Sequence, residues 1–528
     1  MPKKMKNAKT QLLLALLVIC ALWLAPAAHA AAPGITGPTF NLTAQAAFMS
    51  QPDGSMVYSW GYGCNAAPSG YAPAAIAGAF CSSMQVPGPT LIVTQGQTVT
   101  VTLTNNLPAA AGNTSILFPG FQVSSPGGSG VTGLLTQEAA PGGTVTYTFT
   151  ASSPGTRAYY SGTQGDLQVE MGLYGAIIVL PSSIPAACTS GLHTSNLSAQ
   201  AQWGESNFRL AAAAYNHPGA CYDREYLFQF SEIDPRIHRQ VEEQLATITS
   251  CVPSGGAPCP TALNVATEPY VPAYFMVNGR SMPDLMDGNY APEYPHQPYN
   301  GNPHMHPGEL VLLRIIGQGR WQHPFHEHGN HVRVLARDGN LILSETSPDT
   351  NLAGPLLFTT TTTPGQAMDG IYYWTGKGLN WDPFGHSPVA TPAASCTPDA
   401  NGYNTADPTA INYFEWCQDH NKPLQTTPLG AVAGGGPATL PDPNIFANGA
   451  WFGGSPYLGP EATVRAVGPT GTTPPSGTIA NSPTDEAGCA FMWHSHNERE
   501  ITTNNIFPGG MMMMMLVDSR EFVIDESN

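Results

Sequence analysis

Runs in which apolar residues alternate with polar ones recur along much of this chain. In residues 85–105, apolar side chains alternate with Thr and Gln around a glycine turn, which predicts a β-hairpin with one solvated face. Residues 144–150 and 173–180 repeat the pattern and close a predicted first domain near Pro181. A second set of predicted strands comprises residues 225–230, 274–278, 310–316, 331–336, 491–496 and 511–517.

Two stretches depart from this pattern. Residues 235–247 form the one helix predicted outside the N-terminal segment, and residues 379–485, rich in Gly, Pro, Thr and Asn, are predicted to be a large surface insertion. The strands predict an all-β fold of two Greek-key barrels or sandwiches. We place the first domain at residues 31–185, a linker with the first strands of the second domain at 186–268, and the second domain at 269–528.

The composition agrees with short strands joined by many turns. The 528 residues include 56 Gly and 50 Pro, and only 10% are charged, whereas helical bundles and coiled coils are rich in charged residues. The formal net charge is −17, and four of the 19 basic residues lie within the first ten positions. Little positive charge is left to bind a phosphate backbone, so we expect no nucleic-acid partner.

The first 30 residues have the layout of a secretory signal peptide. Four lysines precede the apolar run 12–24, and Ala28-His29-Ala30 offers a cleavage site of small residues. We therefore expect an exported protein, periplasmic or extracellular. No later stretch reaches 18 uninterrupted apolar residues, so no membrane-spanning helix is expected.

Nine cysteines follow the predicted leader, and an oxidising compartment would pair them. Neighbours in sequence suggest the pairs Cys64 with Cys81, Cys188 with Cys221, Cys251 with Cys259, and Cys396 with Cys417. Cys489 is left over. It lies five residues before a histidine pair and is either a thiolate ligand of a metal or a buried thiol.

Histidines gather in two segments of the predicted second domain, His323-Pro-Phe-His326-Glu-His328 and Trp493-His494-Ser-His496. Side chains two residues apart on a strand share a face, so each segment presents a pair of imidazoles that point the same way. If the two strands are neighbours, four imidazoles converge. Imidazole ligands suit copper, zinc, iron or nickel rather than magnesium or calcium, which prefer oxygen.

These segments resemble those of the multicopper oxidases, a family built of cupredoxin barrels. The resemblance rests on His323-Pro-x-His-x-His-Gly329, on His494-x-His496 ahead of a Gly-Met run, and on Val86-Pro-Gly-Pro-Thr90 with Thr104-Asn-Asn-Leu-Pro108. It covers most of residues 85–181 and 270–375, plus 490–517. The resemblance implies two cupredoxin-like Greek-key barrels, with the large insertion in the second, and copper as the cofactor.

The chain departs from the family in three segments. The family's first His-Trp-His-Gly segment falls on Leu117-Phe-Pro-Gly120 and its His-Ser-His segment on Tyr160-Ser-Gly162, so four of the eight histidines of the three-copper cluster are absent. The Cys and the following His of the blue-copper site fall on Ser495 and Glu500, which leaves His323 alone of the usual two His and one Cys. A hydroxyl cannot replace a thiolate as a soft donor, so we do not expect a working laccase.

The resemblance implies a metal-ligand set, which we list as His323, His326, His328, His494 and His496. Glu327, Glu498 and Glu500 lie in the same segments; Glu327 should point to the opposite strand face, as a solvated side chain or as one that supports a ligand. His304 and His306 flank Met305 on a Pro-bounded segment that is either an auxiliary soft-metal site or a plain loop. The methionine run 511–515 is expected to pack in the core.

We therefore expect an exported multicopper-oxidase-like protein that binds copper, or another transition metal, through second-domain histidines. As an enzyme it would be an oxidoreductase that acts on a metal ion or a small reductant without a blue-copper site. Two alternatives stay open: an inactive cupredoxin scaffold in the cell envelope, and a metal-sequestering protein that uses His304, His306 and the methionines. Two-barrel relatives often assemble as trimers, which suggests a homotrimer.

Overall fold

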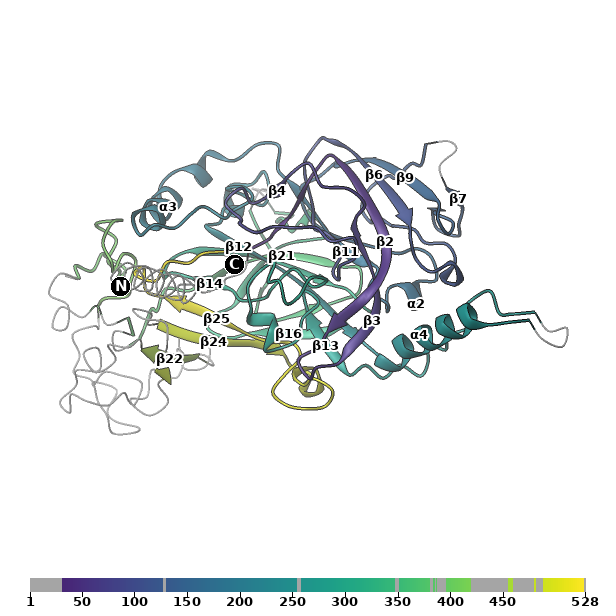
Figure 1. Ribbon diagram of the computed structural model, residues 1–528. Helices are drawn as coiled ribbons and strands as arrows, with labels where there is room; N and C mark the ends of the chain where they lie inside the picture. Colours follow the sequence, from purple (N-terminus) through teal and green to yellow (C-terminus); the bar gives the residue numbers. More distant parts are fainter. Residues whose placement is uncertain are drawn as a thin grey trace, which may run out of the picture.

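The computed structural model describes residues 31–126, 130–253, 258–346, 351–379, 383–384, 386, 396–418 and 488–526, and the backbone path of 454–458 and 479–480. The predicted leader and most of the predicted insertion at 379–485 lie outside these residues. Strands dominate the described chain, so the all-β prediction is confirmed (Figure 1). Among the described residues, no helix is both long enough and apolar enough to cross a membrane.

The N-terminal half forms a sandwich of two sheets with strand orders β10-β11-β5-β1-β4 and β3-β2-β6-β9. Side chains of both sheets, among them Leu42, Trp60, Leu91 and Ile177, share one buried core. A short ribbon pairs β7 (Val131–Thr132) with β8 (Gln137–Glu138). The sandwich strands are β1 (Gly34–Thr36), β2 (Thr39–Ser50), β3 (Met56–Cys64), β4 (Tyr71–Ala72), β5 (Leu91–Thr94), β6 (Thr98–Asn105), β9 (Thr144–Thr150), β10 (Gly155–Tyr160) and β11 (Tyr174–Leu180).

The hairpin predicted at residues 85–105 is wrong. Both strands exist, but β5 pairs with β1 and β11 in one sheet, while β6 pairs with β2 and β9 in the other. Gly96, at φ +89°, makes the turn between them. The alternating pattern identifies strands and their buried faces but not their partners, and here the turn crosses from one layer of the sandwich to the other.

The C-terminal half is a second sandwich, with strand orders β13-β12-β15-β21-β17-β18 and β14-β25-β24-β16-β20. At the edges, β19 pairs with β17, β22 with β24, and β23 with β22. Its strands are β12 (Arg224–Ile233), β13 (Tyr274–Val277), β14 (His304–Met305), β15 (Leu310–Gly317), β16 (His323–Glu327), β17 (Val332–Arg337), β18 (Asn340–Leu341), β19 (Leu356–Leu357), β20 (Thr359–Thr362), β21 (Ala367–Tyr373), β22 (Gly454–Leu458), β23 (Ile479–Ala480), β24 (Gly488–Ser495) and β25 (Met512–Asp518).

The predicted helix at 235–247 is confirmed as α4 (Pro235–Ser250), but it is not the one helix of the described chain. It begins at the cap Asp234, whose side chain accepts a hydrogen bond from the Arg236 backbone N–H, and Ile237 and Val241 enter the core of the first sandwich. The structure adds α2 (Gly165–Gln168) and α3 (Leu192–Gln202), with 3₁₀ turns at Ala109–Ala111, Ala186–Thr189, Pro218–Ala220, Asp284–Met286 and Glu498–Ile501 (η5).

Sequence analysis missed α3 because the helix has no apolar stripe. Polar contacts hold it instead: the Asn196 amide donates to Asp223, and the Gln200 amide donates to Glu309. All four of these side chains are buried. Periodicity of apolar residues cannot reveal a helix that packs through polar groups.

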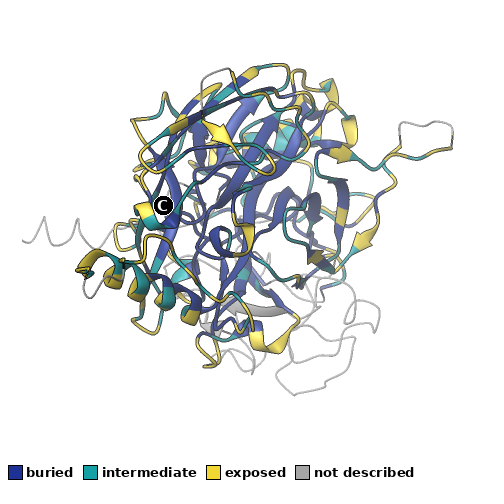
Figure 2. Cartoon of the chain, turned by 90° about the vertical axis from the view of Figure 1, so that its right-hand side faces the viewer, coloured by how far each residue is buried: buried dark blue, intermediate teal, exposed yellow. Residues whose placement is uncertain are grey.

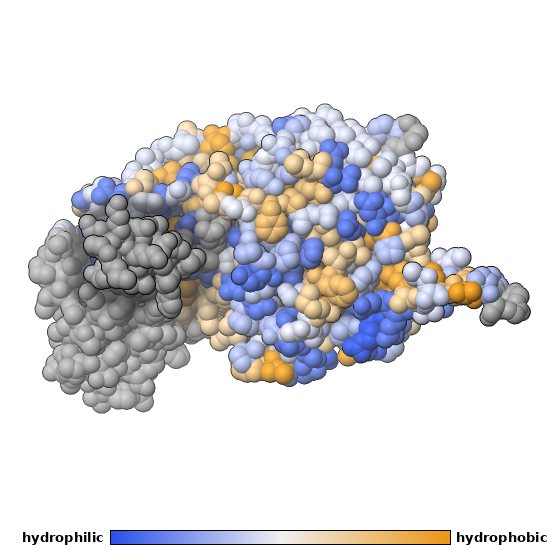
Figure 3. All heavy atoms as spheres, viewed as in Figure 1, coloured by the Kyte–Doolittle hydropathy of each residue, from blue (hydrophilic) through white to orange (hydrophobic). Residues whose placement is uncertain are grey.

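Buried polar contacts join the two sandwiches. Thr156 of β10 donates its hydroxyl to Asp369 of β21 at 2.6 Å, and the Tyr215 hydroxyl donates to the same carboxylate. Arg314 of β15 donates to Thr156 at 3.0 Å and to Glu225 at 2.8 Å. Most strand residues are buried, whereas exposed residues lie mainly on connecting segments (Figure 2). The face seen in Figure 3 mixes hydrophobic and hydrophilic side chains.

The four expected disulfides are all present, namely Cys64–Cys81, Cys188–Cys221, Cys251–Cys259 and Cys396–Cys417. Cys489 is the free cysteine among the described residues and is buried in the second core. Burial raises the pKa of its thiol to about 12, so the side chain is a protonated core thiol and not a thiolate ligand.

Candidate metal centre

The two histidine segments lie on neighbouring strands. β16 pairs antiparallel with β24, and His326 is directly opposite His494. Ring centroids are 5.6 Å apart for His326 and His494, 4.8 Å for His326 and His328, 5.1 Å for His328 and His494, and 5.3 Å for His494 and His496. The sheet therefore gathers four imidazoles, His326, His328, His494 and His496, on one face; we call them the four-histidine cluster.

The spacing of these rings suits a shared metal. A metal–nitrogen bond of about 2.0 Å sets the ring centroids around one ion roughly 5 Å apart. The observed centroid distances are close to this value, and a fifth distance, between His326 and His496, is 4.8 Å. Carboxylates contribute little here, since Glu498 is exposed and its oxygen is 3.7 Å from the His496 ring nitrogen.

The surroundings keep two of these rings neutral, which is the form that binds metal. Burial, together with the nearby His328, His496 and His494 rings, lowers the pKa of His326 to about 4. Burial likewise lowers the pKa of His494. His494 Nδ1 lies 2.8 Å from the Ser495 carbonyl, which can only accept a hydrogen bond, so Nδ1 carries the proton and Nε2 the lone pair.

Neighbouring groups also orient the rings. The Thr359 hydroxyl of β20 lies 2.7 Å from His326 Nδ1. Sequence analysis did not identify Thr359, which belongs to a run of threonines without a distinctive pattern. Contacts of this kind fix the tautomer and the direction of a ligand ring before any metal arrives.

His323 is not part of the four-histidine cluster. Its Nε2 lies 2.9 Å from Glu232 of β12 and its Nδ1 lies 2.9 Å from Glu500, and all three side chains are fully buried. Burial alone would lower the pKa of His323, but the contacts with the two carboxylates raise it to about 9. Both ring nitrogens therefore face carboxylates, an environment that favours the protonated imidazolium.

Ser495 completes this arrangement, because its hydroxyl donates to the same Glu500 oxygen that faces His323. Glu232 is held in turn by the backbone N–H groups of Arg320 and Trp321 and by the Tyr270 hydroxyl. Sequence analysis missed Glu232. The available signal was a carboxylate within the apolar strand Arg224–Ile233, since a charge buried in a strand requires a partner.

Glu327 points to the strand face opposite the histidines, as expected, but it is not solvated. The side chain is fully buried and accepts a hydrogen bond from the Thr360 hydroxyl. Burial raises the pKa of this carboxyl to about 8, so it is largely neutral at pH 7. Glu327 therefore stands behind the cluster and contributes no charge to it.

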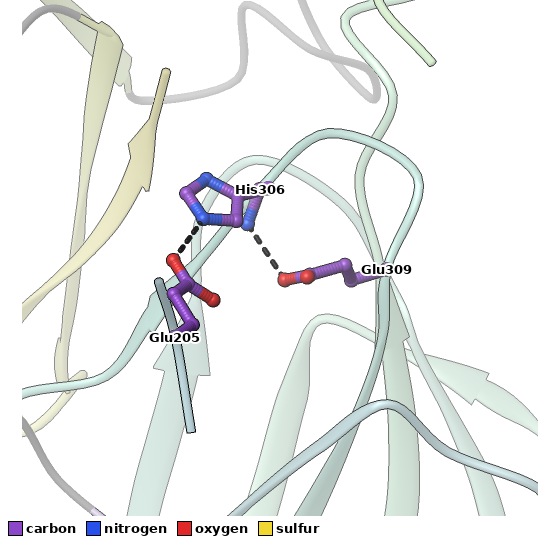
Figure 4. A group of neighbouring side chains, drawn as sticks. All are labelled: Glu205, His306 and Glu309. Atoms are coloured by element: carbon purple, nitrogen blue, oxygen red, sulfur yellow. Dashed lines mark hydrogen bonds and ion pairs between the residues drawn. The ribbon is translucent and has the colours of Figure 1, made fainter. Parts of the chain in front are cut away.

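His304 and His306 do not form a loop or a soft-metal site with Met305. They belong to a buried segment at β14, which pairs parallel with β25, and Met305 lies in the core. The His304 ring contacts Asp518, and His306 Nε2 lies 2.6 Å from Glu205. Figure 4 shows the His306 ring turned toward Glu205 while its backbone nitrogen faces Glu309.

Glu205, His306 and Glu309 bring their ligand atoms within 4.8 Å of one another, which also suits a cation. However, Arg224 already donates to both carboxylates. Burial would raise the pKa of Glu309, but the neighbouring Arg224 and His306 side chains lower it to about 2. The Arg224 guanidinium therefore provides a positive partner for both buried carboxylates without a metal.

The first sandwich has apolar packing at the two segments where the family resemblance implies histidines. The Leu117 backbone N–H donates to the Tyr160 carbonyl at 2.7 Å, and Phe118 is buried in the core. A Cβ atom at Gly162 would lie 2.8 Å from the Leu117 side chain. A histidine at residue 162 would therefore require Leu117 to move.

Comparison with known proteins finds family matches in both sandwiches. Residues 76–183 and residues 266–374 each match a family model described as multicopper oxidase. The chain belongs to the multicopper oxidase family. Its two sandwiches are the cupredoxin-like domains of such oxidases, which confirms the predicted fold class. Copper binding is a general property of this family.

Among curated multicopper oxidase relatives, an L-ascorbate oxidase of Brassica rapa subsp. pekinensis is 41% identical over 96 residues, and the laccase abr2 of Aspergillus fumigatus is 36% identical over 98 residues. Each match covers 18% of this chain and 16% of the relative. Similar solved structures include the multicopper oxidase mgLAC, at 15% identity and a TM-score of 0.42 over 92% of this chain and 88% of that one. A blue copper oxidase from Nitrosomonas europaea has 14% identity and a TM-score of 0.41 over 90% and 85%.

Proposed function

We propose that this multicopper oxidase family member is an exported protein that binds copper through the four-histidine cluster. The observation that carries the proposal is the pairing of β16 with β24, which sets His326 opposite His494 with ring centroids 5.6 Å apart. Low pKa values keep His326 and His494 neutral, and the Ser495 carbonyl and the Thr359 hydroxyl hold the rings in place. Bound copper would supply a centre that exchanges single electrons.

We further propose that any oxidation takes place directly at the cluster, on a metal ion or a small reductant. The blue-copper position, through which laccases pass electrons, holds His323, Ser495 and Glu500 in a hydrogen-bonded and ion-paired network. An imidazolium and a hydroxyl provide no soft donor for copper, so a reductant would have to reach the histidines themselves. His496 is exposed, which supports access to the cluster from solvent. Export and a homotrimer remain predictions.

The test is metal content in matched variants. Wild type, His326→Ala/His494→Ala and the control His331→Ala are loaded with Cu(II), dialysed and measured by plasma mass spectrometry. We expect stoichiometric copper in wild type and in the control, and at least a tenfold weaker affinity in the double variant, without an intense blue colour in any of them. Oxygen consumption with ferrous iron or hydroquinone then tests turnover. Copper near zero in the loaded wild type would contradict the proposal and favour the scaffold.

A further inference from the structure

The methionine run 511–515 divides between the two faces of the sheet. Met511, Met513 and Met515 are fully buried in the second core, together with Phe325 and Trp493. Successive side chains of a strand point to opposite faces, so Met512 and Met514 point away from this core. The expectation of core packing therefore holds for the odd-numbered methionines, whereas Met512 is buried on the other face of the sheet and Met514 is half-buried.

The face that receives the even-numbered methionines is the one that carries the four-histidine cluster. β24 and β25 are antiparallel, with His494 opposite Met512 and Met492 opposite Met514 (Figure 1). Directly opposite side chains have Cβ atoms about 5 Å apart, and diagonal neighbours about 7 Å. The thioether side chains of Met492, Met512 and Met514 are therefore neighbours on two strands. Met512, at one end of this row, lies beside the cluster histidine His494.

The exposure of these residues separates them from ordinary core methionines. Met492 and Met514 are half-buried, and Met512 is 5% exposed, whereas the odd-numbered residues have no exposed surface. Leu516 follows Met514 on the same face and ends the row of sulfur atoms. Met492 and Met514 are therefore accessible to an ion that approaches from outside the sheet, and the buried Met512 lies next to them on the same face.

Thioether sulfur is a soft, uncharged donor that selects monovalent copper over harder divalent ions. We propose that Met492, Met512 and Met514 form a binding site for Cu(I), beside the four-histidine cluster and distinct from it. The register of β24 and β25 brings these three side chains together, and the site would bind Cu(I) whether or not a metal occupies the histidines. It would hold a cuprous ion, as substrate or as incoming cofactor, next to His494.

Silver(I) serves as a redox-inert probe of this site, and Cu(I) affinity is measured without oxygen against a chromogenic Cu(I) chelator. The test variant is Met492→Leu/Met514→Leu, which keeps side-chain size but removes two sulfur atoms. The matched control, Met513→Leu/Met515→Leu, makes the same exchange on the core face. We expect at least tenfold weaker Cu(I) binding in the test variant and less than a twofold change in the control.

X-ray absorption at the silver edge should show sulfur neighbours in wild type and in the control, and fewer in the test variant. Silver bound by nitrogen alone, or equal losses in the test and control variants, would overturn the site. A sulfur shell that persists in His326→Ala/His494→Ala protein supports it even if the histidines fail to hold Cu(II). The two proposals can therefore fail separately.

Discussion

The Nε2 atom of His323 lies 2.9 Å from a carboxylate oxygen of Glu232, although 91 residues separate them in sequence. The contact joins β12 to β16 across the second sandwich. A proton on the imidazole supplies positive charge between the buried carboxylates of Glu232 and Glu500. Ser495 and Glu500, where the family resemblance implies a Cys and a His, thus form an ion-paired network with His323.

Replacement of His323 by Ala should strongly destabilise the protein. The change leaves Glu232 and Glu500 buried without a positive partner, and breaking a buried ion pair in this way costs about 3–5 kcal/mol. Urea denaturation of His323→Ala should show this loss, while the half-buried His331→Ala should lose about 1 kcal/mol or less. Equal losses in the two variants would show that the network does not stabilise the fold.

The same network should make stability depend on pH in the alkaline range. The pKa of His323 is about 9 in the folded protein, against an ordinary value of 6.5 in the unfolded chain. Its contribution is fully present below pH 6.5 and is lost as the pH rises to about 9. The difference in unfolding free energy between wild type and His323→Ala should therefore narrow by up to about 3 kcal/mol. A difference that stays constant from pH 6 to 9.5 would contradict the charged state of the ring.

A blue-copper site should return when both missing ligands are restored. Ser495 and His323 both contact the same oxygen of Glu500, so a Cys at 495 and a His at 500 would face the His323 ring. We expect an intense blue absorption in copper-loaded Ser495→Cys/Glu500→His, because a thiolate and two imidazoles then converge. Ser495→Cys alone should stay pale, since Glu500 still pairs with His323. Colour in the single variant, or none in the double one, would disprove this assignment.

Arg224 should be essential to the buried cluster around Glu205 and Glu309. Its replacement by Met leaves two ionised carboxylates without their partner, for an expected loss of about 3–5 kcal/mol in unfolding free energy. The control is Arg236→Met, where a half-exposed guanidinium pairs with Asp234 and the loss should be much smaller because solvent screens the pair. Thermal or urea unfolding measures both. A stable Arg224→Met protein would indicate that another cation balances the carboxylates.

Local pattern was sufficient to predict the two histidine pairs that make up the four-histidine cluster. The spacing of His326 and His328, and of His494 and His496, fixes which side chains share a strand face. Strands such as β9, β12, β15 and β25, and also α4, follow from periodicity, but the long strands β2 and β3 were not predicted. Which strands become neighbours is a nonlocal property, and the expectation that β16 and β24 adjoin came from the family resemblance.

The position of His323 could not be predicted in this way. Its environment depends on Glu232, from a distant strand, and on Glu500, from η5 beyond β24. No local spacing connects these three residues. The resemblance implied a ligand role for His323, whereas in the structure both of its ring nitrogens face carboxylates.

The repeated methionines of β25 have a consequence for how this strand finds its place. A shift of one residue exchanges core and outer positions, but within residues 512–514 it would exchange methionine for methionine, so the run cannot define its own alignment. Contacts at the two ends of the strand must therefore define its alignment. At one end the Met511 N–H donates to the Glu500 carbonyl, and at the other Asp518 contacts the His304 ring. Mutations at Asp518 or His304 should therefore permit slippage of the strand, and with it a misplaced set of sulfur atoms beside the histidines.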